Sequence, residues 1–389
     1  MSILRRTFPA ALSAGVAMAL VASIGAAPAS AQEASATTSG EFARFVPKSA
    51  VQQTSLDYAV WDEALRYVVF RMGRSSREAA PSVDPALGSR RAWGHTSRYR
   101  LEGNRVIFEF LEQDIIDSLT AYKQDLESVA EQVDIAALPR NEQLAFWINL
   151  HNAAVIEQLA QKYPVRSPSL PKFGVDNVPL DEAKVITING VAMSPKDIRT
   201  KIVYPNWNDP KVIYGFFRGE IGGPSIAGEA FTGANVSRLL SDNAREFVNS
   251  LRGVEKIGGT MHVSKIYEEA RPFFFANWDA DLRTHIEKFA RDDVAGVLEN
   301  TKSIDASLYE TDISDLAGGQ LEPSYNDVVT LEGDDIGKSQ GTRVPRSVAR
   351  LILEHRKKIN EMIRRKELTP RVIVVDMQNP ENEDGYVVE

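Results

Sequence analysis

The sequence predicts a helix-rich α+β protein with a single main domain and a small antiparallel or mixed sheet. Several stretches carry apolar residues at helical spacing, and one of them, 141–162, is bounded by Pro139 and by a proline-rich segment after it. Another stretch, 184–193, alternates instead and contains Asn189-Gly190, a pair that favours a tight β-hairpin turn. Many helices with a few hairpin-joined strands are typical of the α+β class.

The N-terminal half is predicted to be mainly helical. A first helix is expected over 55–70, followed by a loop over 73–91 that is rich in Ser, Arg, Pro and Gly. A long helix is expected over 105–129. The next helix, 141–162, has Asn141 as its N-cap candidate.

The second half of the chain alternates strand and helix patterns. A buried strand over 209–217 is expected to open into a glycine-rich segment with Gly219, Gly222 and Gly223, where backbone can approach a ligand closely. The other expected elements are a hairpin over 184–193, a helix over 235–251, a short strand at 261–263, a helix from about Asp279, a basic helix over 345–366 and a short strand over 371–375.

The first residues have the three parts of a secretory signal peptide. Arg5 and Arg6 precede an apolar run rich in Ala, Leu and Val, which ends in the small-x-small pattern Ala29-Ser30-Ala31. We expect cleavage after Ala31 and a soluble mature protein that is exported, either periplasmic or secreted. No later apolar run is long enough to span a bilayer, so we expect no transmembrane segment after signal removal.

The composition argues against several kinds of chemistry. The formal net charge of −8 argues against nucleic acid as a partner. There is no cysteine, which removes thiol catalysis, disulfides and cysteine-ligated metal sites. The helix 141–162 shows no His-x-x-x-His spacing, and we expect neither a metal ion nor an organic cofactor.

Three polar side chains on the helix 141–162 are expected to point toward the core. On a helical wheel His151 and Asn152 fall inside the apolar arc around Ile148, and Asn149 lies at the edge of that arc. Each must find hydrogen-bond partners, or its burial costs about 1–3 kcal/mol. They could form the polar floor of a site, with His151 as general base or ligand, or a satisfied buried network that fixes the helix.

Two blocks of the sequence resemble a known family. Asn141-Glu-Gln-Leu-Ala-Phe-Trp-Ile-Asn-Leu-His-Asn-Ala153 is similar to the Ala-Phe-Trp-Ile-Asn-x-Tyr-Asn-Ala block of the family catalogued as domain of unknown function 547. Asp209-Pro-Lys-Val-Ile-Tyr-Gly-Phe-Phe-Arg-Gly219 aligns without gaps to the family's Asp-Pro-Arg-Ile-His-Phe-Ala-Leu-Asn-Cys-Gly block. The resemblance extends over roughly 101–316.

The residue patterns and this resemblance together predict a division of the chain into four regions. They are a signal peptide at 1–31, an N-terminal helical lead-in at 32–100, a family-like core domain at 101–316 and a C-terminal extension at 317–389. The periodic pattern weakens beyond Arg291. The extension is expected to hold an acidic loop, the basic helix, the short strand and an acidic tail.

The departures from the family concern its reactive residues. The family's His, Cys and second Cys fall on Ile213, Arg218 and Gly223, and a further family His falls on Thr200. If family members use a cysteine nucleophile with a histidine base, this chain has lost both parts. The resemblance therefore implies a fold and the place of a site with degenerate catalytic positions.

The first functional hypothesis is a ligand-binding or scaffolding protein. Its partner would be an unknown small molecule or an envelope protein. The Arg218 guanidinium could bind a carboxylate or phosphate through its planar fork, or it could pair with Glu220 or another acid. The expected ligand-binding set is Asn149, His151, Asn152, Arg218 and Glu220, gathered around a common pocket.

The alternative hypothesis is a hydrolase or acyl transferase acting in the cell envelope. Ser225 would be its nucleophile, with His262 or His151 as the base. A serine nucleophile needs a base within hydrogen-bond reach, so the distance between these side chains separates the two hypotheses.

Overall fold

The computed structural model describes residues 40–49, 53–83, 93–322 and 344–368, together with the backbone of four short strands beyond residue 322. The signal peptide predicted at 1–31 lies outside these residues, as do most of the acidic loop and the acidic tail. None of the helices in the described ranges is long and apolar enough to cross a membrane.

The architecture is helix-rich α+β, as the sequence predicts. The α-helices are α2 (Ala59–Val68), α3 (Gln113–Gln132), α4 (Arg140–Lys162), α5 (Pro195–Asp197), α6 (Tyr204–Asn206), α7 (Val236–Val248), α8 (Ile266–Phe274), α9 (Trp278–Glu287), α10 (Asp292–Glu299) and α11 (Arg346–Arg364). The shorter helical turns are η1 (Glu41–Phe45), η2 (Phe108–Phe110), η3 (Ile135–Ala137), η4 (Ile198–Val203), which has π-helical geometry, and η5 (Pro210–Gly215).

The strands are short and form small, separate sheets. They are β1 (Val69–Phe70), β2 (Arg105–Val106), β3 (Ile186–Ile188), β4 (Val191–Met193), β5 (Val254–Ile257), β6 (Thr260–Ser264), β7 (Ser303–Leu308), β8 (Val329–Thr330), β9 (Gly337–Lys338), β10 (Ile373–Val374) and β11 (Tyr386–Val387). The sheet β5–β6–β7 is mixed, because β5 pairs antiparallel and β7 pairs parallel with β6. The strand predicted over 371–375 corresponds to β10.

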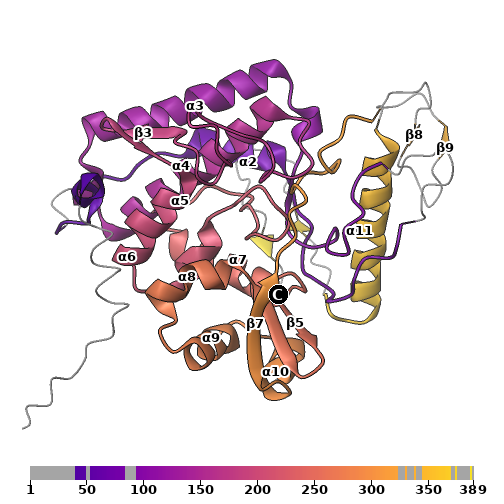
Figure 1. Cartoon of the computed structure of the whole chain (residues 1–389). Helices are drawn as coiled ribbons and strands as arrows, with labels where there is room; N and C mark the ends of the chain where they lie inside the picture. Colours follow the sequence, from indigo (N-terminus) through magenta and orange to yellow (C-terminus); the bar gives the residue numbers. More distant parts are fainter. Residues whose placement is uncertain are drawn as a thin grey trace, which may run out of the picture.

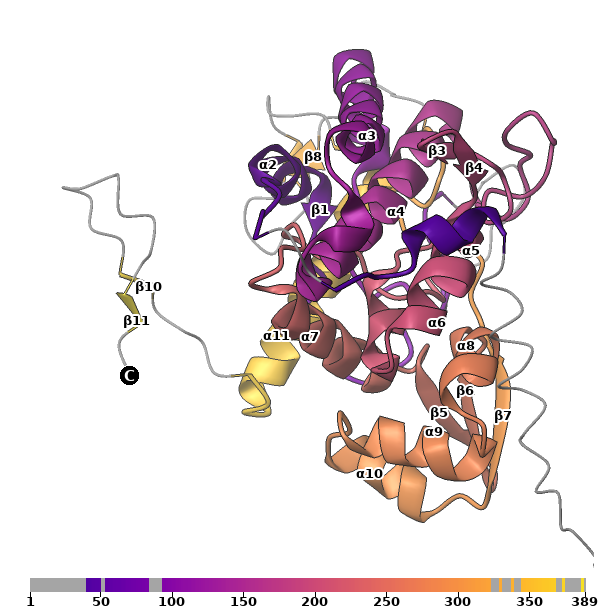
Figure 2. The same cartoon turned by 90° about the vertical axis from the view of Figure 1, so that its left-hand side faces the viewer.

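The elements form a helical layer with the mixed sheet at its far end. Helices α3 and α4 lie side by side, with α3 at the end of the molecule opposite β5, β7, α9 and α10 (Figures 1 and 2). Helix α11, yellow in Figure 1, packs against the flank of this body. Its apolar contacts belong to a small cluster of its own, built around Met72, Leu101, Val348 and Leu351.

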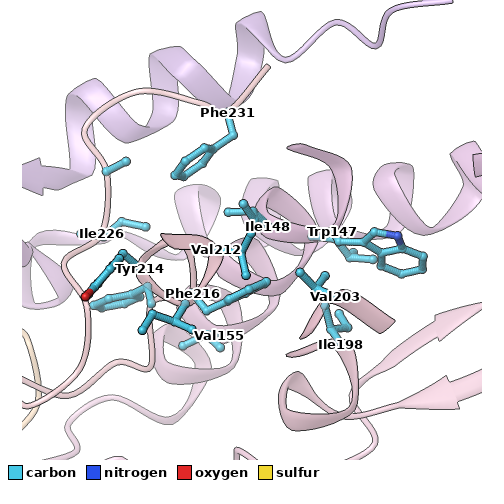
Figure 3. Close-up of a cluster of buried hydrophobic side chains, with 14 of the residues drawn as sticks. Trp147, Ile148, Val155, Ile198, Val203, Val212, Tyr214, Phe216, Ile226 and Phe231 are labelled. Atoms are coloured by element: carbon cyan, nitrogen blue, oxygen red, sulfur yellow. The ribbon is translucent and has the colours of Figure 1, made fainter. Parts of the chain in front are cut away.

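Helix α4 is the centre of the core. It begins at Arg140 with Pro139 as its N-cap residue, so the predicted N-cap, Asn141, lies inside the helix, and it ends at Lys162 as predicted. Its buried residues cover the whole circumference, which is expected of a helix enclosed on all sides. Figure 3 shows Ile148 and Val155 among apolar side chains from the segments around Val203 and Phe216.

The predicted hairpin is confirmed. Strands β3 and β4 pair antiparallel, with Ile188 opposite Val191. The turn residues Asn189 and Gly190 have φ of 47° and 78°, which explains why the turn needs this pair. Three predicted helices are also present, at 55–70, 235–251 and 345–366, and each is shorter at its ends than predicted. The strand predicted at 261–263 is present and slightly longer.

The long helix predicted over 105–129 is wrong at its start. Residues 105–106 form β2, which pairs with β1, and α3 begins only at Gln113. The apolar spacing from Ile107 to Leu111 fits a helix equally well, but Val106 is tied to Val69 of the distant β1 strand. Tertiary pairing therefore decides the conformation.

The buried strand predicted over 209–217 is also wrong. The segment forms the helical turn η5, in which the Asp209 side chain accepts a hydrogen bond from Lys211 N and Pro210 occupies the first position. A short apolar run that is buried on all sides shows no periodicity that separates strand from helix.

Helices α8 and α10 and strand β7 are among the elements that were not predicted. Helix α8 contains Pro272, which the sequence indicates as a helix breaker, and α10 and β7 lie beyond Arg291, where the pattern weakens. Strand β7 alternates in exposure, but it is stabilised by parallel pairing with β6 about forty positions earlier in the chain.

Gly219 allows the chain to pass close to α4. Its φ is +79°, and a Cβ atom at this position would lie 2.4 Å from Leu159 Cδ1. The position therefore requires both the left-handed backbone and the absence of a side chain. This turn lies between Arg218 and Glu220 and fixes where their side chains emerge.

Gly219→Ala is expected to destabilise the protein by about 2–5 kcal/mol, since the left-handed backbone costs about 1–2 kcal/mol and overpacking about 1–3 kcal/mol. Gly258→Ala is the matched control, because Gly258 has φ +62° but nothing within 4 Å of the added Cβ. Urea denaturation of both variants measures the difference. Equal losses would contradict the close packing of Gly219 against α4.

Candidate functional site

A cleft with a cavity of about 280 Å³ opens beside α4 and the segment that follows η5. Its lining residues are Val155, Pro168, Ser169, Pro179, Leu180, Asp181, Pro195, Arg218, Glu220, Lys265 and Tyr309. Two predicted ligand-binding residues, Arg218 and Glu220, therefore share one cavity, and α4 contributes Val155 to its wall. Across the described ranges, no group of three His, Asp or Glu side chains could hold a metal ion.

Glu220 is a buried carboxyl group at the cleft. It is 7% exposed, and the Ser169 N–H donates to its Oε1 at 3.2 Å. Burial raises its pKa to about 7, although hydrogen bonds from Tyr309 and Ser169 and the charge of Arg218 favour the ionised form. Near neutral pH the Glu220 carboxyl can therefore either donate or accept a proton.

Arg199 holds the charged groups behind the cleft together. It is fully buried, and its guanidinium makes paired hydrogen bonds to Asp181 at 2.7 and 2.7 Å and to Glu269 at 3.0 and 3.0 Å. The remaining N–H lies 3.1 Å from His151 Nε2. All five guanidinium donors of Arg199 are thus used.

Arg218 is joined to the same cluster through Glu269. Its Nη2 and Nη1 lie 2.6 and 3.3 Å from the Glu269 carboxylate oxygens. Burial opposes the charge on Glu269, but Arg218 and Arg199 outweigh it and lower the pKa of this carboxyl to about 2. Asp181 also has a lowered pKa, because Arg199 and Arg218 outweigh its burial.

His151 is fully buried and does not line the cavity. Because Arg199 can only donate, His151 Nε2 must accept, so Nδ1 carries the proton and donates to Asn152 Oδ1 at 3.0 Å. Burial and the charge of Arg199 together lower the pKa of His151 to about 3. The imidazole is therefore neutral with both nitrogens occupied, and it positions Arg199.

The other two polar residues of α4 bind backbone. Asn149 donates to Phe231 O at 2.7 Å and accepts from Phe231 N at 3.1 Å. Asn152 donates to Gly215 O at 2.9 Å and accepts from Phe217 N at 3.0 Å. Both amides point into the core, as expected, and they fix the segments that flank Arg218.

Ser225 lies in a different buried cluster. Its hydroxyl donates to Glu246 Oε2 at 2.8 Å and accepts from Arg252 Nη2 at 3.0 Å and Asn104 N at 3.2 Å. Its proton and both lone pairs are therefore engaged, and none of these partners is a histidine.

His262 lies on β6 and is also separate from the cleft. Its Nδ1 is 2.7 Å from Ser307 Oγ and 3.4 Å from Asp305 Oδ2. The structure therefore brings together neither His262 and Ser225 nor His151 and Ser225.

Several residues of the cleft were not found from the sequence. Arg199 and Glu269 form its charged support, and Asp181, Lys265, Tyr309 and Ser169 line it. Only Arg199 could have been connected with the site from the sequence, because it directly precedes Thr200, the residue aligned with a family His. Thr200 itself donates to Lys196 O and does not line the cleft.

A comparison with protein families supports the resemblance seen in the sequence. Residues 135–248 match the family described as "Protein of unknown function, DUF547". The matched part contains α4, η4, η5, Arg218 and Glu220, whereas Lys265, Glu269 and Tyr309 lie beyond it. No curated protein and no solved structure matched the chain.

Arg199→Met is expected to cost about 3 kcal/mol of stability at neutral pH, because it removes a fully buried guanidinium and leaves the partly buried Asp181 and Glu269 carboxylates without their partner. Arg238→Met is the matched control, since Arg238 also contacts two carboxylates but is 55% exposed. Its loss should be below about 1 kcal/mol. Urea denaturation compares the variants, and similar costs would contradict the structural role of Arg199.

The cost of Arg199→Met should shrink in acid. The pKa values of Asp181 and Glu269 are lowered in the folded protein, so the stability they contribute is present above about pH 4 and is lost as pH falls through their folded values. On acidification the wild-type protein loses the stability contributed by these ion pairs, whereas the variant already lacks most of it. The difference in the free energy of unfolding between the two proteins should therefore decrease.

Proposed function

We propose that the mature protein is exported and binds a small molecule in the cleft between α4, Asp181 and Glu220. The cavity of about 280 Å³, which combines apolar walls with convergent polar groups, is the observation that carries this proposal. Its support is rigid, because Arg199 has every donor satisfied and His151 has both nitrogens engaged. Groups arranged in this way are suited to hold a ligand in one orientation.

Binding accounts for these groups better than serine catalysis does. Ser225 is fully hydrogen-bonded away from the cleft, and the two candidate histidines bond to other partners. The positions aligned with the family's reactive residues carry Ile213, Arg218 and Gly223. Of these three residues, Arg218 has a guanidinium group, which can bind an anion but cannot act as a nucleophile.

Ligand binding is tested by a thermal-shift screen of small molecules on the mature protein. Ser169→Trp should abolish the stabilisation by cleft ligands, because this exposed residue lines the cavity and an indole would fill it. Ser118→Trp, on the exposed face of α3, is the matched control and should retain the response. A compound that still stabilises the Ser169→Trp variant binds elsewhere. If every stabilising compound behaves in this way, the proposal is refuted.

Export is tested at the predicted cleavage site. The N-terminus of the exported protein should be Gln32, and Ala31→Leu should leave the precursor uncleaved because it removes the small residue next to the cut. Ser30→Leu is the control, since the middle position of the small-x-small pattern is not restricted. Mass spectrometry of the cell fractions distinguishes these forms, and an intact Met1 terminus in the wild-type protein would contradict export by this signal.

A further inference from the structure

On the basis of this proposed function, we propose that the ligand of the cleft is a small organic acid. A single carboxylate would bind at Lys265, Arg218 and Glu220, and an apolar body would lie against the proline-rich wall. The inference rests on the charges around the cavity, on the contacts of Glu220 and on the composition of the walls.

The charges behind the cleft compensate one another. The guanidinium groups of Arg199 and Arg218 face two carboxylates, those of Asp181 and Glu269, within one hydrogen-bonded cluster. The cluster therefore adds little net charge to the cavity. The contacts with Glu269 do not use all the donors of Arg218, and its Nε is buried without a hydrogen-bond partner.

Lys265 adds a positive charge that the protein does not neutralise. It is exposed and lines the cleft, and in the described part of the chain its ammonium makes no hydrogen bond or ion pair. The one acid at the cavity without a cationic partner is Glu220, which is largely uncharged below about pH 7. The net charge at the cavity is then positive and favours an anionic ligand.

Glu220 gives the site a proton donor. When it is protonated, its hydroxyl can donate to a ligand carboxylate while Oε1 still accepts from Ser169 N. An anion beside Glu220 also stabilises the protonated form, since two neighbouring carboxylates repel each other. Binding should therefore take up a proton and should weaken as pH rises above about 7.

The walls select the rest of the ligand. Pro168, Pro179 and Pro195 present rigid rings to the cavity, and Val155 and Leu180 complete an apolar lining. A compact, multiply charged ion such as inorganic phosphate would leave this lining unmatched and would need more cations than the cavity offers. A monocarboxylate with an aliphatic or aromatic body fits both parts.

The test is calorimetry of the mature protein with pairs of probes that differ in charge. Phenylacetate and hexanoate are compared with phenylacetamide and hexanamide, which keep the apolar body, and with phenethylamine, which carries the opposite charge. We expect each acid to bind at least about tenfold more tightly than its amide, as one charge-assisted contact predicts.

Two variants assign the effect to named residues. Lys265→Met should reduce the affinity for the acids to that of the amides, whereas Lys256→Met, which removes an exposed lysine on β5 away from the cavity, should change nothing. In the wild-type protein the affinity for phenylacetate should fall between about pH 6 and pH 8. Glu220→Gln should abolish this pH dependence.

Glu220→Gln has an independent readout in the ligand-free protein. Because the folded pKa of Glu220 is raised to about 7, its ionisation destabilises the fold as pH rises from about 4.5 through 7. The variant lacks this loss and should gain in Tm over the wild-type protein between about pH 5 and pH 8. A Tm difference that does not change with pH would contradict the role given to Glu220.

The outcomes separate the ligand class from the existence of a ligand site. Amides or the amine binding as tightly as the acids, with binding lost in Ser169→Trp, would overturn the organic-acid proposal and leave the cleft as a binding site. If no probe and no screened compound loses its binding in the Ser169→Trp variant, the proposed binding function itself is wrong.

Discussion

The buried guanidinium of Arg199 is the interaction on which the candidate site depends. It binds Asp181 and Glu269 through paired hydrogen bonds and reaches His151 on α4, so three segments far apart in the sequence meet at one planar group. A buried charge of this kind is tolerated only when its partners are complete. The same requirement keeps the two carboxylates ionised and places Arg218, through Glu269, at the wall of the cleft.

The polar face of α4 has a positioning role that complements this charge. Asn149 and Asn152 hold backbone groups at Phe231, Gly215 and Phe217, which locates the chain on both sides of the glycine-rich segment. Gly219 then lets that segment lie against α4. The backbone contacts of Asn149 and Asn152 and the turn at Gly219 therefore help to place Arg218 and Glu220 in the cleft.

The sequence predicted several of the longer helices, the hairpin and the inward direction of three polar residues, because these follow from local periodicity and turn chemistry. It also placed Arg218 and Glu220 beside α4, through the resemblance to a family. It did not find the contacts of Arg199, since Asp181 and Glu269 are eighteen and seventy positions away and no local pattern links them. The strand predicted over 209–217 failed for a related reason, because a fully buried run carries no periodic signal. The role given to His151 as a base depended on a free nitrogen, which only the hydrogen-bond partners could decide.

Tyr309, which directly follows β7, completes the lining of the cleft, and β7 is held in place by its parallel pairing with β6. The chain is synthesised from the N-terminus, so most of the binding groups precede the residues that close the cavity. The cavity is therefore incomplete in any stretch of the chain that ends before Tyr309. The ligand proposed for this cleft would then meet its complete lining only after the chain has been synthesised past Tyr309.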